Sequence, residues 1–146
     1  MRPTVTEQLE GMCRILENAV APALANDYTL ETLRSLVANV RMLGRAWHQL
    51  LPFLHWDNGV MAGLLTTAAH SAAPELQARI TAALNAAPVD ASDGQAAEAR
   101  NEQLRVLLTE CLESPPALME AIASHLSERS RRYPLRLTGA VPKHKG

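Results

Sequence analysis

The stretch DYTLETLRSLVANVRMLGRAWHQLLPFL, residues 27–54, has the clearest helical periodicity in this chain of 146 residues. Residues on one face of it recur at alternating steps of three and four, namely Leu30, Leu33, Val37, Val40, Gly44, Trp47, Leu51 and Leu54. Leu36, Leu43 and Leu50 widen this face on one side. A sustained apolar face packs against other helices in a bundle. We therefore expect a long helix around which the rest of the chain is built.

Pro52 interrupts this pattern. Proline has no N–H to donate to the carbonyl of His48, and its ring crowds that carbonyl, so we expect a kink or a restart near Pro52. Asp57, Asn58 and Gly59 then offer a turn or a new N-cap. A third helix is expected from there to about Ser71.

Capping signals place the other helices. Thr4 and Glu7 form a capping box for a first helix that ends near Ala21. Pro74 suits the first position of another helix, and residues 85–94 form a loop. Two further starts are predicted, at residues 92–95 and at residues 114–115. Together these signals predict an all-α fold, an antiparallel bundle of five or six helices. We expect it to occupy residues 1–133, followed by a basic tail at residues 134–146.

The composition favours a folded, helical protein. Hydrophobic residues make up 47% and charged residues 20%, which is enough apolar material for a packed core. The two cysteines, Cys13 and Cys111, do not suggest a disulfide framework, and we expect both to be buried. The sequence has neither a signal peptide nor an apolar run long enough to span a membrane, so a cytoplasmic location is expected.

Charge is distributed unevenly. All fifteen acidic residues lie before residue 129, against eight Lys and Arg, whereas residues 129–146 hold six Lys and Arg and no acid. The arginines there are candidates for binding an anion or an acidic partner: Arg129, Arg131, Arg132 and Arg136. A solvated helix terminus explains them equally well. The body is acidic and has no helix-turn-helix signature, which argues against a nucleic-acid partner.

The segment 46–74 contains one charged residue, Asp57, and three of the five aromatic residues. A helix that is poor in charge on all sides lies at the centre of a bundle or is covered by another chain. Tryptophan is enriched in interfaces, so a homodimer formed through this segment is one expectation.

Arg34, Arg41, His48 and His55 recur every seven residues, so they share a face on an unbroken helix. This face is expected to meet an anion or the acidic residues of the first helix, such as Glu10 and Glu17.

Enzymatic and metal sites have little support. His48, His55 and Asp57 would have to converge around Pro52, and the sequence lacks the helical His-x-x-x-His, His-x-x-x-Glu and Glu-x-x-His spacings. Gly-rich phosphate loops and serine-nucleophile motifs are also absent. No metal and no cofactor is expected.

Three functions stay open. The leading hypothesis is a non-enzymatic accessory or interaction protein that acts as a homodimer and binds a further protein. The second is a small-molecule binder with an apolar pocket, and the third is an enzyme that uses His48, His55 and Asp57. The first two share one set of ligand or interface candidates: Trp47, His48, Phe53, His55, Trp56, Asp57, Asn58, Met61 and Leu64.

Overall fold

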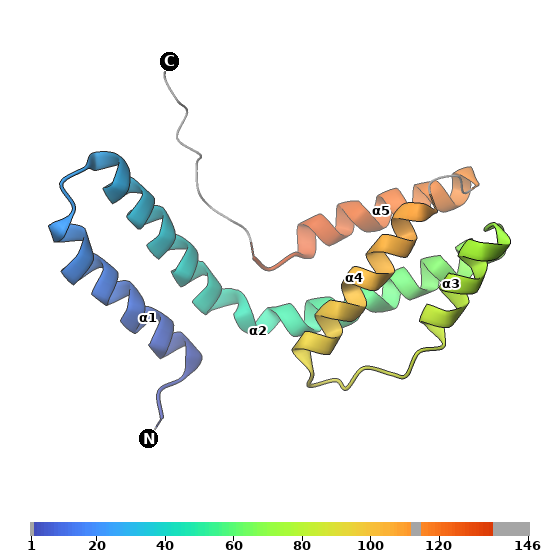
Figure 1. Cartoon of the computed structure of the whole chain (residues 1–146), viewed down its shortest axis with the longest axis horizontal. Coiled ribbons are helices and arrows are strands. Elements are labelled where there is room, and N and C mark those ends of the chain that lie inside the picture. The colour runs from blue at the N-terminus through green and yellow to red at the C-terminus, as the bar shows by residue number, and fades with distance from the viewer. Residues whose placement is uncertain (1, 112–114, 136–146) are drawn as a thin grey trace, which may run out of the picture. The chain divides into compact units, whose positions relative to one another are not determined.

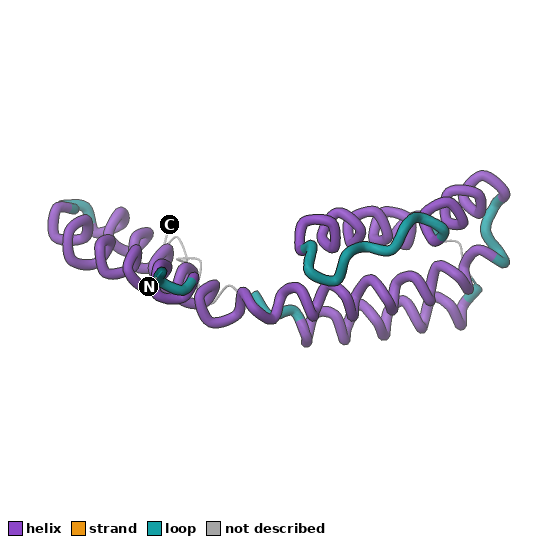
Figure 2. Tube along the Cα trace, turned by 90° about the horizontal axis from the view of Figure 1, so that it is seen from below, coloured by secondary structure: helices purple, strands orange, loops and turns teal. Residues whose placement is uncertain are grey.

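A computed structural model describes residues 2–111 and 115–135. It contains five α-helices and two short helical turns, and no strand occurs in this part of the chain (Figure 2). The elements are α1 (Val5–Ile15), the π-turn η1 (Leu16–Val20), the 3-10 turn η2 (Ala21–Ala23), α2 (Asp27–Ala69), α3 (Pro74–Leu84), α4 (Gly94–Glu110) and α5 (Pro116–Arg132). The predicted all-α helical bundle is confirmed. None of the described helices has the length and hydropathy needed to cross a membrane.

Of the kink or restart expected at Pro52, the restart does not occur, because α2 runs through Pro52 as one helix of 43 residues. A proline inside a helix costs about 3 kcal/mol, since it removes one backbone hydrogen bond and crowds a carbonyl. The next two residues, Phe53 and Leu54, are buried, and their packing offsets that cost. Asp57 and Asn58 do not cap a new helix, because their side chains bond to other helices instead.

The chain forms two compact units that divide α2 between His48 and Gln49. Unit 1 comprises residues 2–48 with 134–135, and unit 2 comprises residues 49–133 apart from 112–114. The predicted basic tail lies outside the described residues from residue 136 onward.

Unit 1 is a helical hairpin in which α1 runs antiparallel to the first half of α2 (Figure 1). The predicted capping box is confirmed: the Glu7 N–H donates to Thr4 Oγ1 at 3.2 Å, and the Thr4 N–H donates to Glu7 Oε2 at 2.7 Å. Side chains of α1 contact the backbone of α2 at two places. The Thr6 hydroxyl donates to the Gly44 carbonyl at 3.2 Å, and the Cys13 thiol lies 3.7 Å from the Val37 carbonyl oxygen.

Arg41 joins the helices of the hairpin by charge. Its guanidinium donates to Glu17 at 2.7 and 2.8 Å and to Glu10 at 3.2 Å. These contacts raise the pKa of Arg41, and the bonds from Arg41 lower the pKa of Glu17. The predicted contact between this face of α2 and the acidic residues of the first helix is thereby confirmed for Arg41. Arg34 pairs with Glu31 on its own helix.

Unit 2 packs its helices in two layers, with α2 and α5 in one and α3 and α4 in the other (Figure 2). All four helices contribute to its main core, which contains Met61, Leu65, Ala68, Ile80, Ala83, Leu104, Leu107, Leu108, Cys111, Leu118 and Ile122. A second cluster joins Phe53 and Leu54 to Ala97. Cys13 and Cys111 are free and buried, as predicted, and burial raises the pKa of both thiols.

Two helix starts differ from the prediction by one residue. Asp93, not Ser92, caps α4, because its side chain accepts from the Ala96 N–H at 2.9 Å. Pro116 takes the first position of α5, and Ser114 lies outside the described residues. Pro74 begins α3 as predicted.

Candidate functional site

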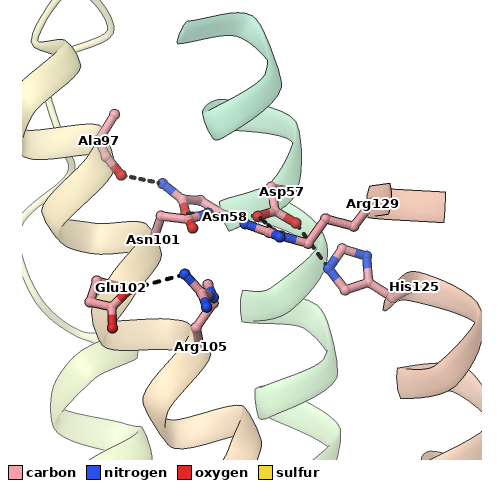
Figure 3. A network of polar contacts seen from close by, with 8 residues as sticks. All are labelled: Asp57, Asn58, Ala97, Asn101, Glu102, Arg105, His125 and Arg129. Atoms are coloured by element: carbon pink, nitrogen blue, oxygen red, sulfur yellow. Dashed lines mark hydrogen bonds and ion pairs between the residues drawn. The ribbon is translucent and has the colours of Figure 1, made fainter. Parts of the chain in front are cut away.

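Asp57, the lone charge of segment 46–74, is wholly buried in unit 2. Its Oδ2 atom accepts two hydrogen bonds, one from Asn101 Nδ2 at 2.7 Å and one from Arg129 Nε at 2.8 Å (Figure 3). Its Oδ1 atom lies 3.0 Å from His125 Nε2. The carboxylate of α2 therefore contacts polar groups of both α4 and α5, and a buried charge requires such partners.

Amide groups extend the network along α4. Asn101 Nδ2 also donates to Asn58 Oδ1 at 2.9 Å, and Asn58 Nδ2 donates to the Ala97 carbonyl at 3.0 Å. Each side chain thus bonds to a neighbouring helix (Figure 3). These bonds link α4 to α2 within unit 2.

His125 is the least satisfied member of the network. Its ring is 3% exposed and lies at ion-pair distance from Asp57 Oδ1, yet neither ring nitrogen has an aligned hydrogen bond in the described structure. The ring also packs on Trp56, with the centroids 5.6 Å apart.

Aromatic rings cover the network on the α5 side. The Arg129 guanidinium lies over Phe53 at 5.6 Å and over Tyr133 at 6.0 Å, and Phe53 and Tyr133 pack edge to face. The Arg132 guanidinium lies 4.5 Å from the centre of Trp56. Such stacking shields a charge pair from water and strengthens it.

This geometry suits a structural network better than a catalytic one. A general base has to reach a substrate proton, whereas Asp57 has no exposed surface and is occupied by neighbouring side chains. No group of three or more His, Cys, Asp or Glu side chains that could hold a metal occurs within residues 2–111 and 115–135.

The structure separates the residues predicted as one site. Phe53, Trp56, Asp57 and Asn58 belong to the network and its aromatic cover. His55 lies apart from it, with Nε2 3.0 Å from the Ala91 carbonyl oxygen.

The remaining ligand or interface candidates lie in other surroundings. Met61 is in the main core and Leu64 packs against that core. Trp47 and His48 belong to unit 1 and are exposed. Most of the large apolar side chains of segment 46–74, through which a homodimer was one expectation, are therefore covered within unit 2.

The arginines predicted for an anion or acidic partner are engaged within the chain. Arg129 binds Asp57, and both Arg131 and Arg132 pair with Glu128, whose pKa these bonds lower. Arg136 lies outside the described residues.

A second feature lies on unit 1, where eight large apolar side chains are exposed, Val20 and Tyr28 among them. We call the other six the hairpin face: Val5, Met12, Ile15, Leu36, Leu43 and Trp47. On α1 they follow steps of seven and three, and on α2 steps of seven and four, so each set follows one side of its helix. Isolated exposed apolar residues are ordinary, whereas a contiguous patch marks an interaction site.

Both sets lie on the same side of the hairpin. Met12, Leu36 and Leu43 each directly precede a buried residue that faces the other helix. The side chain of each is therefore rotated by about 100° about its helix axis from the direction of the other helix. Because the two helices are antiparallel, this rotation brings the side chains of both helices to the same side of the hairpin. The charged contacts of Arg41 with Glu10 and Glu17 lie on the opposite side of the hairpin.

Sequence reasoning missed Asn101 and His125. A signal for His125 existed, because the buried face of α5 recurs at steps of four, three and four through Leu118, Ile122, His125 and Arg129. A lone carboxylate in a charge-poor segment needs a counter-charge on another apolar face, and α5 supplies it. Asn101 has no comparable signal in α4.

Comparison with known proteins adds no relative: no protein-family model, no curated protein and no solved structure matches this chain.

Proposed function

We propose that this chain is a non-enzymatic interaction protein that acts as a homodimer through the hairpin face. The observation that carries the proposal is the exposure of six large apolar side chains on one side of a two-helix unit. None of these positions is charged. Charge is depleted in the cores of protein interfaces in the same way.

The size of unit 1 supports a second copy as the occupant. Two helices cannot bury their apolar residues from water on both sides, whereas two hairpins packed face to face make a four-helix bundle. Residues 5–20 span about 24 Å, and two helices side by side are about 20 Å wide. Burying this face on both copies removes about 1,000 Å² in total, which reaches the lower limit for a specific interface. We therefore expect a dimer of modest, micromolar affinity.

Two further observations support a non-enzymatic role. The carboxylate with the most elaborate surroundings, Asp57, is wholly buried and bonded to Asn101 and Arg129. His55 faces a backbone carbonyl rather than Asp57. Residues with these partners have no free position from which to act on a substrate.

The proposal is tested by Leu43→Glu, which places a carboxylate in the apolar interface of the dimer. We expect the dimer to weaken by at least about 100-fold, because burying an unpaired charge costs several kcal/mol. Sedimentation equilibrium over a range of protein concentrations measures this. Ala38→Glu is the matched control, an exposed position on the same helix away from the hairpin face, and should leave the dimer intact. A wild-type chain that stays monomeric at high micromolar concentration would refute the proposal.

Native mass spectrometry separates the proposal from the two other hypotheses. A mass equal to two bare chains supports the interaction protein. A smaller molecule retained at a fixed stoichiometry would favour a ligand-binding protein instead.

A further inference from the structure

The first half of α2 has a side that points away from α1. A Cβ atom at Gly44 would lie 3.6 Å from Leu9 of α1, and Ala46, two residues later, is rotated from that direction by about 200°. Ala46 shares its side with residues at steps of four and three. We call this set the outer side of α2: Ser35, Asn39, Met42 and Ala46.

The outer side is partly covered although α1 packs elsewhere. Ala46 is only 8% exposed, and the other three residues are half-buried. The Oδ1 atom of Asn39 is buried and accepts no hydrogen bond in the described structure. Buried polar atoms nearly always have a partner, and most side-chain hydrogen bonds join the backbone or water. A chain lying along the outer side would bury its apolar residues and offer an N–H to Asn39.

The chain that follows α5 begins at the right place for this role. Pro134 and Leu135 come directly after the last residue of unit 2, yet they belong to unit 1, and both are half-buried. The ring of Tyr133, just before them, packs on Phe53 with the centroids 5.2 Å apart. Phe53 follows Ala46 by seven residues in α2. The next part of the chain therefore starts at the Ala46 end of the outer side.

We propose that residues 136–146, which lie outside the described structure, bind along the outer side of α2 in the same chain and run from Ala46 toward Ser35. This binding is separate from the proposed homodimer, which uses the hairpin face. Eleven extended residues reach about 36 Å, and the outer side is about 16 Å long, so the segment is long enough. Its first half contains the apolar residues Leu137 and Val141.

Charge favours the same direction. The second half of the segment contains Lys143 and Lys145, and the whole segment has no acidic residue. Along α2, Glu31 lies about one turn before Ser35, and Asp27 lies about one turn before Glu31; both are exposed. A segment that runs antiparallel to α2 brings its lysines toward these carboxylates, and complementary charges favour that orientation over the reverse.

Thiol labelling of the full chain tests the proposal. Ala46→Cys is introduced into the wild-type sequence and into a chain of the same length that carries Leu137→Asp and Val141→Asp. We expect the new thiol to react with a maleimide at least about tenfold faster in the second chain, because carboxylates disfavour burial of the segment.

Two controls accompany the comparison. Ala38→Cys, at an exposed position on the same helix, should react equally fast with either form of the segment. The native Cys13 and Cys111 are buried and should react slowly in every chain, which shows that both units are folded.

Two outcomes would overturn the proposal. Equal labelling rates of Ala46→Cys in the two chains would show that residues 136–146 do not cover the outer side. Protection of Ala46→Cys that appears only at high protein concentration would assign the cover to a second copy. Binding within one chain would then be wrong, whereas the proposed homodimer would still be decided by the Leu43→Glu experiment.

Discussion

The two halves of α2 have the same kind of sequence and opposite surroundings. The first half is covered by one helix and the second by three. Of the described apolar residues that are buried, three belong to unit 1 and fourteen to unit 2. The apolar face of a helix therefore does not show by itself whether the same chain covers it, and in unit 1 part of that face is exposed.

The largest expected effect is in unit 2. Asp57→Ala leaves the buried Asn101 and His125, and Arg129, whose side chain is 24% exposed, without the carboxylate that they contact. We therefore expect the free energy of unfolding to fall by about 3–5 kcal/mol. Urea denaturation followed by circular dichroism measures it. Asp90→Ala, a change at an exposed carboxylate, is the control and should cost far less. A loss below about 1 kcal/mol for Asp57→Ala would mean that the network does not hold the helices together.

A leucine truncated in each half of α2 compares the two units directly. Leu65 is fully buried, and Leu65→Ala should cost about 2–5 kcal/mol of stability through the cavity it leaves. Leu43→Ala should cost less than about 1 kcal/mol in the monomer and should weaken the dimer instead. Denaturation at low protein concentration and sedimentation at high concentration separate these effects. Equal losses of monomer stability would erase the distinction between the units.

Each unit contains one cysteine, which makes its opening measurable. Both thiols are buried and have raised pKa values, so a thiol reagent reaches them when the structure opens. We expect Cys13 to be labelled at least about tenfold faster than Cys111, because the hairpin has the smaller core. Higher protein concentration should slow Cys13 alone, since dimerisation stabilises unit 1. Mass spectrometry of labelled peptides distinguishes the sites, and equal rates would contradict the comparison.

The smallest effect concerns acid. Glu17 bonds to Arg41 in unit 1, and its pKa is lowered from 4.5. A carboxyl group with a lowered pKa stabilises the fold above its unfolded value and loses that contribution as the pH falls. The stability of unit 1 should therefore decline slightly as the pH drops below 4.5, and Arg41→Met should remove this part of the decline. Urea midpoints between about pH 3 and 6 measure it, and an unchanged pH profile in the variant would exclude the pair as its source.

Local signals in the sequence predicted the helices well. The capping box at Thr4, the proline that begins α3 and the contact of Arg41 with the acidic residues of α1 all depend on residues near one another in sequence or on one helix face. The restart after Pro52 failed because the packing of Phe53 and Leu54 on other helices outweighs the local effect of proline.

The sequence predicted the residues of the candidate site on α2 but not their partners, because it shows local patterns and not contacts between distant helices. Trp56, Asp57 and Asn58 were visible as polar and aromatic residues in a charge-poor segment. Their partners lie on α4 and α5, and no local pattern states which helices will meet. Periodicity also does not show which side of α2 is covered by α1. That Leu36, Leu43 and Trp47 are exposed is therefore known only from the structure.

The span of the Asp57 contacts sets an order of events during synthesis. Asn101 follows Asp57 by 44 residues and Arg129 follows it by 72 residues. A ribosome adds about 5–20 residues per second, so several seconds pass between the synthesis of Asp57 and that of Arg129. The described bonds between α1 and α2 involve residues up to Trp47, all of which precede Asp57 in the chain. The hairpin can thus form first, and in the proposed dimer its exposed face would be available to a second nascent chain before unit 2 has closed.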